Sequence, residues 1–352
     1  MRTGKIAALL LSGVMAASVL TGCGEIDKNA VVATLDGTEV SLGVANFAAR
    51  LQQAGVDDFY VAYFGAEVWS SDLYGNGTTM ADTTKESVMQ SLFDIYTLKA
   101  HMADYSVDLS EDEKRVIADA TSAFLNSNTE EALGALGADQ ATVEEYLTLM
   151  TIQKKMRSAI IADVDRDVSD EEANTGAYSY ARVSKKTYKD AEGNSVEYTQ
   201  EELGELAGTV EAFAASAKEG NFETAAEQYG YTVSSGTFTA ADEKVDAAVL
   251  DALRGLEEGG LSGVIDTEND YYVVRLDAKT DTAATEQTRQ TIISDRENAR
   301  YDEVLAGWKE GHTWDVDTKV WGKVTFDNLF TTVVQSTEAV GAGTEQMEPT
   351  EQ

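Results

Sequence analysis

The sequence predicts an α+β fold with two domains, and three observations lead to this prediction. About 310 residues are suited to ordered structure, which is enough for two domains. After one strand-like run at residues 31–35, apolar residues recur at helical spacing through the first half of the chain. Residues 178–276 then alternate between short strand-like and helical patterns, and a long helical pattern follows.

Polar residues that can cap a helix mark the expected helix starts in the first half. A turn at residues 36–37 follows the strand, and Ser41 then precedes a helix with an apolar face. Capping-box patterns predict three further helices, which begin at Thr83 with Glu86, Ser110 with Glu113, and Thr142 with Glu145. We therefore expect the first half to be a helical domain entered through one strand.

An irregular segment at residues 55–82 lies between the first two of these helices and is rich in aromatic residues. They are Phe59, Tyr60, Tyr63, Phe64, Trp69 and Tyr74. Such a cluster is more often part of a core than of a binding groove, but an exposed apolar groove would be a binding surface. The sequence favours the core and leaves both interpretations open.

The second half predicts a separate α+β domain after residue 168. Strands are expected at residues 178–183, 232–238, 264–265 and 271–276, with helices at 199–218, 222–229 and 246–254. Thr199 with Glu202, and Asn221, are the expected helix caps. The order of these elements ends in an antiparallel hairpin, and a long helix at residues 285–309 follows it.

The beginning of the chain has the pattern of a secretory signal that ends at a lipid-modified cysteine. Two basic residues precede an apolar run at residues 6–20, and the sole cysteine, Cys23, follows a leucine and two small residues. This pattern resembles the lipobox of bacterial lipoproteins, which implies that Cys23 becomes the first residue of the mature protein and carries the lipid. The alternative is an ordinary signal peptide with a chance cysteine. The expected location is the extracytoplasmic face of the cell membrane, with a lipid anchor.

Composition narrows the classes of partner and of chemistry. The formal net charge is −35, and removal of the two basic residues in residues 1–22 makes it −37 (−35 − 2), which disfavours nucleic acid as a partner. The chain has two histidines, His101 and His312, far apart in sequence, so a metal site has little support. No phosphate-binding glycine motif is present, and no cofactor is expected.

Five short segments of the second half follow the order of a known family. They are residues 218–222, 225–229, 236–238, 256–262 and 270–276. In this order they resemble a parvulin-type peptidyl-prolyl isomerase domain, over residues 177–278. The wider layout of residues 31–325 resembles the PrsA/SurA-like foldases. This implies a helical SurA-like N-terminal chaperone domain that a C-terminal helix completes, with a parvulin-like α+β domain inserted.

The parvulin resemblance also implies a site, and the sequence departs from it. Parvulins have two facing histidines, one on the first strand and one on the last, above an apolar proline pocket. These positions fall on Tyr180 and Tyr272. A neutral tyrosine, with a pKa of about 10, cannot replace a tautomeric histidine pair. The two tyrosines are either an altered site or ordinary aromatics of a sheet, and we expect weak or absent isomerase activity.

The proline pocket implied by the resemblance consists of Phe238, Val249 and Leu253, and the family's pocket phenylalanines fall near Val249 and Arg254. The implied organisation is a signal peptide (1–22), a tether (23–30), a helical chaperone domain (31–168), a parvulin-like domain (169–280), a C-terminal helix and strand that pack on the helical domain (281–335) and a disordered tail (336–352).

The expected function is that of a membrane-anchored foldase or chaperone of parvulin type, whose partners are unfolded or partly folded exported proteins. The sequence leaves open whether isomerase activity survives, which proteins are clients and what the oligomeric state is. One alternative is a solute-binding lipoprotein of a transport system, which would be expected to have two lobes of βαβ units. Another is a structural envelope protein with a relic domain.

Overall fold

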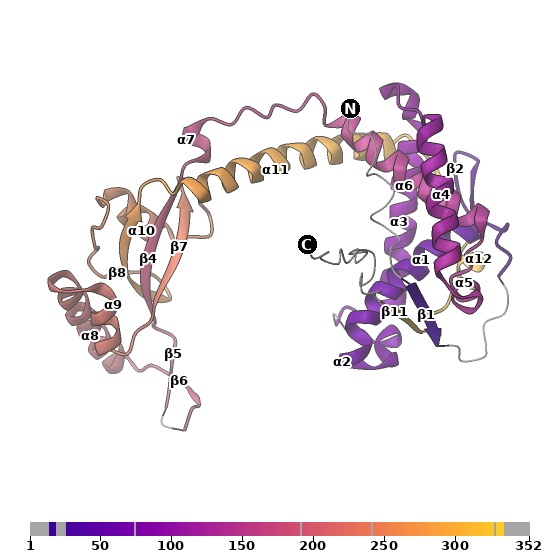
Figure 1. Ribbon diagram of the computed structural model, residues 1–352. Coiled ribbons are helices and arrows are strands. Elements are labelled where there is room, and N and C mark those ends of the chain that lie inside the picture. Colours follow the sequence, from indigo (N-terminus) through magenta and orange to yellow (C-terminus); the bar gives the residue numbers. More distant parts are fainter. Residues whose placement is uncertain are drawn as a thin grey trace, which may run out of the picture. The chain divides into compact units, whose positions relative to one another are not determined.

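The chain forms two compact units, shown in Figure 1. The computed structural model describes residues 14–18, 26–73, 75–190, 192–240, 242–326 and 329–333. Unit 1 combines residues 1–163 with 300–352, and unit 2 comprises residues 164–299. The long helix α11 (Thr282–Lys309) belongs to both, whereas the sequence placed the boundary before it. Its first part packs within unit 2, since Thr285 Oγ1 accepts from Thr175 N at 3.1 Å.

Unit 1 is mainly helical. Its elements before residue 164 are β1 (Val14–Ser18), β2 (Val31–Leu35), β3 (Thr38–Ser41), α1 (Leu42–Val56), the π-helix η1 (Asp57–Val61), α2 (Ala62–Phe64), the 3₁₀ helices η2 (Ala66–Ser70) and η3 (Met102–Tyr105), α3 (Met80–Ala100), α4 (Glu111–Ser127), α5 (Glu130–Leu136) and α6 (Gln140–Ile160). Its later elements are β10 (Trp314–Val316), α12 (Thr318–Trp321) and β11 (Leu329–Val333).

The helix caps of unit 1 agree with the sequence at two starts and differ at two. Ser41 caps α1, and Ser110 with Glu113 forms the capping box of α4, as predicted. The prediction for α3 is wrong by one turn, because Thr79 and Asp82 form its capping box. The prediction for α6 is also wrong, because the Asp139 carboxylate caps it and accepts from Thr142 N at 2.9 Å.

Residues from the end of the chain complete the core of unit 1. Strand β10 pairs with β2 in the three-stranded antiparallel sheet β10-β2-β3. The Trp314 ring stacks on Phe93 of α3 at a centroid distance of 5.2 Å, and Trp321 of α12 is buried. The last turns of α11 add Leu305 to a buried cluster with Leu98 and Met156. The expected completion of the helical domain by a C-terminal helix and strand therefore agrees with the observed packing.

Unit 2 is an antiparallel sheet with helices on both faces. The elements are α7 (Asp170–Ala173), β4 (Thr175–Ser184), β5 (Thr187–Lys189), β6 (Ser195–Glu197), α8 (Gln200–Glu219), α9 (Phe222–Gln228), β7 (Val233–Thr239), α10 (Ala247–Gly255), β8 (Ile265–Asp266) and β9 (Asp270–Ala278). The sheet order is β7-β4-β9-β8. Thr199 with Glu202 caps α8, Asn221 caps α9 and Asp246 caps α10. The predicted α+β fold class is confirmed.

The period of two along the central strands divides unit 2 into two apolar clusters. Ala181 of β4 and Val273 of β9 contact α8 and α9, where Phe213 is fully buried. Tyr180 of β4 and Val274 of β9 point to the opposite face, which α10 covers. Figure 1 shows α8 and α9 as one helical pair and α10 as a separate helix beside the strands.

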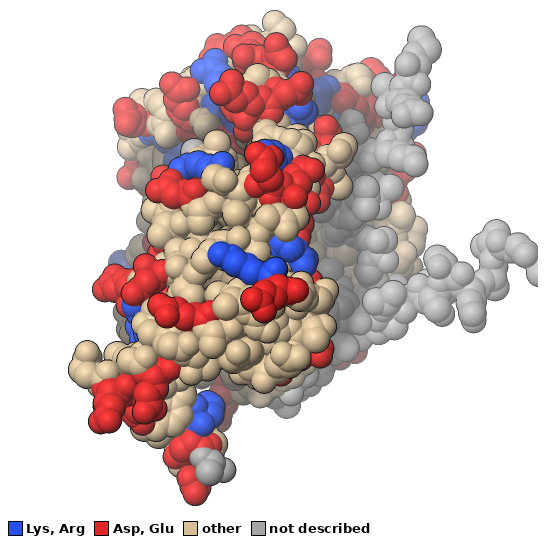
Figure 2. Space-filling view, turned by 90° about the vertical axis from the view of Figure 1, so that its left-hand side faces the viewer, with Lys and Arg blue, Asp and Glu red and all other residues tan. Residues whose placement is uncertain are grey.

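Acidic side chains are spread over the face drawn in Figure 2, with smaller basic patches between them.

The predicted leader and lipid site fall largely outside the described residues. Strand β1, which lies within the predicted signal peptide, pairs antiparallel with β11. Cys23 and the tail at residues 336–352 lie outside the described residues. Among the helices that the structure describes, none is both long and apolar enough to cross a bilayer.

Candidate functional site

A cluster of tyrosines lies on the face of the unit 2 sheet that α10 covers. The rings of Tyr180 and Tyr272 lie 6.2 Å apart between centroids, with their planes tilted by 47°. Tyr178 is 5.4 Å from Tyr180 and 5.9 Å from Phe238 of β7. These separations are those of aromatic rings in contact. The two tyrosines at the implied dyad positions therefore pack in one row of rings.

The other predicted site residues belong to the same cluster. Val249 and Leu253 of α10 are buried at 2% and 1% exposure, and Phe238 packs against them as a partly buried ring. Arg254 points elsewhere, because its guanidinium donates to Asp251 Oδ1 at 2.7 Å and to the Ala240 carbonyl at 2.6 Å. The structure thus brings Phe238, Val249 and Leu253 together with both tyrosines and leaves Arg254 out.

Two glycines make room for the rings, and the sequence analysis gave neither of them this role. A Cβ atom on Gly176 would lie 2.4 Å from the Phe238 ring, and one on Gly236 would lie 2.9 Å from the Tyr178 ring. Real Cβ atoms do not approach other atoms this closely. Tyr178, which is nearly buried, was also missed as a member of the cluster. The alternation of Tyr178 and Tyr180 along one strand was the available signal.

The environment favours the neutral hydroxyl at Tyr178 and at Tyr272. Burial raises the pKa of Tyr178 above its ordinary value, and the neighbouring Tyr180 and Tyr272 add to the rise. Burial also raises the pKa of Tyr272, while the guanidinium of Arg182 opposes the rise. Arg182 is itself paired with the buried Asp270 at 2.9 Å. A neutral hydroxyl can donate a hydrogen bond to a carbonyl oxygen but cannot exchange protons near pH 7 as histidine does.

A segment that contains most of this cluster matches a known family. Residues 179–290 match the family model of the PPIC-type PPIASE domain, which is the parvulin class of peptidyl-prolyl isomerases. The chain contains a parvulin-type domain. The matched residues include Tyr180 and Tyr272, so both positions without histidine lie inside the domain. No curated protein matches the sequence.

Several solved foldase structures are similar to the chain. The foldase PrsA of Streptococcus pneumoniae is 18% identical and covers 68% of this chain and 92% of its own, with a TM-score of 0.29. PrsA of Lactococcus lactis is 13% identical and covers 84% and 99%, with a TM-score of 0.33. A SurA-like chaperone of Campylobacter jejuni is 11% identical and covers 82% and 99%, with a TM-score of 0.31.

Unit 1 carries a second candidate site, a patch of exposed aromatic side chains. Phe59, Tyr63 and Phe64, called here the aromatic patch, are 63%, 77% and 56% exposed. The patch lies on η1 and α2, where Tyr60 stacks on Phe64 at 5.9 Å. Trp69 behaves differently, since it is 4% exposed and stacks on Phe326 at 4.4 Å. The preference for an internal cluster is therefore wrong for the patch and right for Trp69.

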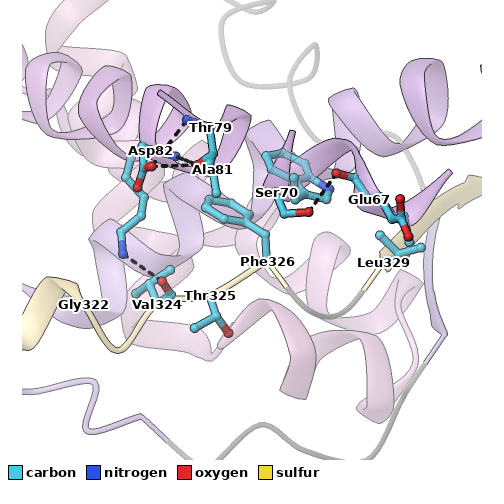
Figure 3. Close-up of a pocket in the computed structure, with 13 residues that line it drawn as sticks. Glu67, Ser70, Thr79, Ala81, Asp82, Gly322, Val324, Thr325, Phe326 and Leu329 are labelled. Atoms are coloured by element: carbon cyan, nitrogen blue, oxygen red, sulfur yellow. Dashed lines mark hydrogen bonds between the residues drawn. The ribbon is translucent and has the colours of Figure 1, made fainter. Parts of the chain in front are cut away.

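Unit 1 also contains a pocket with a volume of about 570 Å³ next to the Trp69–Phe326 stack (Figure 3). It is lined by Ala66, Glu67, Trp69, Ser70, Thr79, Ala81, Asp82, Lys85, Gly322, Val324, Thr325, Phe326 and Leu329. Lys85 donates to the Val324 carbonyl at 2.9 Å, and burial lowers the pKa of Lys85. The rings of Trp69 and Phe326 beside a few polar groups give this pocket the mixed lining of ligand-binding sites.

A buried carboxylate holds the walls of this pocket together. Asp57 of η1 is 4% exposed and accepts hydrogen bonds from Trp69 Nε1 and from Phe330 N of β11, each at 2.8 Å. Such charge-assisted bonds fix the Trp69 ring relative to η1, which bears the start of the aromatic patch. The patch and the pocket therefore share one local framework in unit 1.

Proposed function

We propose that the protein is an extracytoplasmic foldase that binds unfolded segments of exported proteins and has weak or no prolyl isomerase activity. The observation that carries this proposal is the parvulin-type domain with a packed tyrosine cluster at both positions where its family has histidines. Residues 164–299 contain no histidine at all. The aromatic patch of unit 1 supplies a surface for apolar chain segments.

The proposal of weak isomerase activity is supported by the residues of the site. Prolyl isomerisation must cross a barrier of about 18–20 kcal/mol that arises from amide conjugation. Tyr180 and Tyr272 pack against each other and against Tyr178, so the cluster offers apolar contact and neutral hydroxyls but no imidazole. A protease-coupled assay on an X-Pro peptide tests this. We expect a rate close to the uncatalysed one, and substantial turnover that Tyr180→Phe with Tyr272→Phe abolishes would contradict the proposal.

The holding of unfolded chains rests on the aromatic patch. Its three rings are exposed although each could bury a large apolar area against a client. Replacement of all three (Phe59→Ser, Tyr63→Ser and Phe64→Ser) should weaken suppression of aggregation of an unfolded secreted protein. Val116→Ser is the matched control, because Val116 is an exposed apolar residue on α4, away from the patch in sequence. If the wild type and the triple variant suppress aggregation equally, the aromatic patch does not bind the client.

The proposed location rests on the pattern before Cys23. A lipid on this residue would hold the protein at the membrane surface where exported chains emerge unfolded. Its acyl chains would provide the two-signal anchoring that one chain does not. Cys23→Ser should release the protein from the membrane fraction of the producing cell. If the variant stays in the membrane fraction, the proposed lipid anchor is wrong.

The solute-binding alternative receives no support from the observed topology. Every strand pairing in the described residues is antiparallel. Lobes of βαβ units would contain parallel pairs. A thermal-shift screen with small molecules would revive this alternative if one compound raised the melting temperature strongly.

A further inference from the structure

The two histidines of the chain, which are 211 positions apart, meet in unit 1. His101 follows α3, and His312 follows α11. Their Nε2 atoms lie 3.0 Å apart. The sequence analysis found no paired histidine, and the structure corrects this.

The opposite nitrogen of each ring is bound to a carboxylate. His101 Nδ1 lies 2.6 Å from Asp104 Oδ2, and His312 Nδ1 lies 2.5 Å from Asp36 Oδ2. A carboxylate accepts hydrogen bonds, so each Nδ1 carries the proton and each Nε2 of a neutral ring presents its lone pair. Two lone pairs that face each other at 3.0 Å repel unless a positive group lies between them.

The surroundings hold both rings in place. The His101 ring stacks on Trp308 at a centroid distance of 4.1 Å with an interplanar angle of 3°. Asp36 is fixed as well, because its Oδ1 accepts from Thr313 N at 2.8 Å. The two histidine side chains keep 22% and 15% exposure, so water reaches them.

We propose that His101 and His312 bind one divalent late transition-metal ion through their Nε2 atoms, with water completing its coordination. Histidine ligands of metals characteristically donate their other ring N–H to a carboxylate, as both do here. For an ion about 2.0–2.1 Å from each nitrogen, the angle between the two metal–nitrogen bonds would be roughly 90°. This is the angle between neighbouring ligands in square-planar sites of Cu²⁺ and Ni²⁺. Mg²⁺ and Ca²⁺ prefer oxygen ligands.

The ion would join three parts of unit 1, namely the end of α3, the residues after α11 and the turn between β2 and β3. Within the described residues, no group of three or more His, Cys, Asp or Glu side chains is arranged to hold a metal. The remaining ligands are therefore waters, and binding should be reversible. A proton shared between the two Nε2 atoms would also relieve the repulsion, and the experiment separates the two cases.

The test is a calorimetric titration of the full chain, free of any affinity tag, with Ni²⁺ near pH 7.5. We expect one ion per chain at the tightest site and a rise in the melting temperature of unit 1. His101→Gln with His312→Gln should abolish both, although the variant keeps every carboxylate of this acidic chain. Asp104→Asn leaves both ligands in place and should weaken binding about 10- to 100-fold. Asp119→Asn, an exposed carboxylate on α4, is the control and should change nothing.

The variants must first match the wild type in circular dichroism with EDTA present. Equal Ni²⁺ binding by the wild type and the double histidine variant would overturn the proposal. A second result would also overturn the proposal. In it, stoichiometric Ni²⁺ leaves the imidazole NMR signals of both histidines unchanged, and a scalar coupling across an Nε2–H···Nε2 hydrogen bond is still observed. That result would show a shared proton instead.

Discussion

Gly176→Ala tests whether the ring cluster of unit 2 has the observed packing. The new Cβ would lie 2.4 and 2.5 Å from two atoms of the Phe238 ring and 3.1 Å from the Ala278 carbonyl oxygen. The ring must move, and Tyr178, whose ring contacts it at 5.9 Å between centroids, restricts the movement. Overpacking of this kind costs about 1–3 kcal/mol. Since about 1.4 kcal/mol is a factor of ten in an equilibrium constant, local opening should become about 5- to 150-fold more frequent.

Hydrogen exchange of the β4 and β7 amides in the full chain measures this opening. Tryptophan fluorescence provides an internal control, because all four tryptophans lie outside residues 164–299 and should report an unchanged unit 1. Gly204→Ala is the matched control, since a Cβ at this exposed position in α8 meets nothing within 4 Å. It should stabilise the helix by about 0.5–1 kcal/mol.

The Phe238→Ala background separates the ring contact from other causes. If the Phe238 ring is the obstacle, Gly176→Ala should cost much less in that background, and the two changes should be strongly non-additive. Equal costs in both backgrounds would refute the packing described for the cluster. Equal exchange in wild type and Gly176→Ala would do the same.

Three further predictions concern ionisation, capping and the buried carboxylate. The raised pKa values of Tyr178 and Tyr272 mean that the folded state holds their protons longer than the unfolded state. Their contribution to the free energy of unfolding is therefore complete below pH 10 and is lost as the pH rises through the folded pKa values. In Tyr178→Phe, the melting temperature should fall less steeply with pH over this alkaline range than in the wild type. Thr199→Ala should cost about 1 kcal/mol in α8, whereas Thr209→Ala within the same helix should cost less, as measured by exchange of α8 amides. Asp57→Ala should lower the melting temperature of unit 1 and shift the fluorescence of Trp69. The reason is that two buried N–H donors lose their acceptor, at a cost of about 1–3 kcal/mol each. An unshifted spectrum would argue against the hydrogen bond from Trp69 to Asp57.

Local patterns predicted much of the fold because they act over a few residues. The capping boxes at Ser110 and Thr199 form as the sequence indicates, since each links residues three apart. The same reasoning gave the wrong start for α3, because Thr79 and Thr83 are both suitable cap residues. Thr79 with Asp82 begins the helix one turn before Thr83, and this adds a turn whose first residue, Met80, is buried. The short helix α5 was not predicted, because its seven residues carry too little periodicity.

The sites were less predictable because they depend on residues distant in the chain. The parvulin resemblance implied one site from Tyr180, Tyr272, Phe238, Val249 and Leu253, and these residues do lie in one cluster. The contact of His101 with His312 follows from the way residues near the end of the chain pair with β2. No local pattern contains that information. The exposure of the aromatic patch likewise depends on whether distant segments of unit 1 pack over it, which no local pattern shows.

The most direct test of the proposed function is the refolding of a secreted protein whose slow phase is prolyl isomerisation. Equimolar full-length protein should raise the refolded yield and leave the rate constant of the slow phase unchanged, and the triple variant of the aromatic patch should lose the gain in yield. Acceleration of the slow phase that depends on Tyr180 and Tyr272, or no gain in yield, would contradict the account.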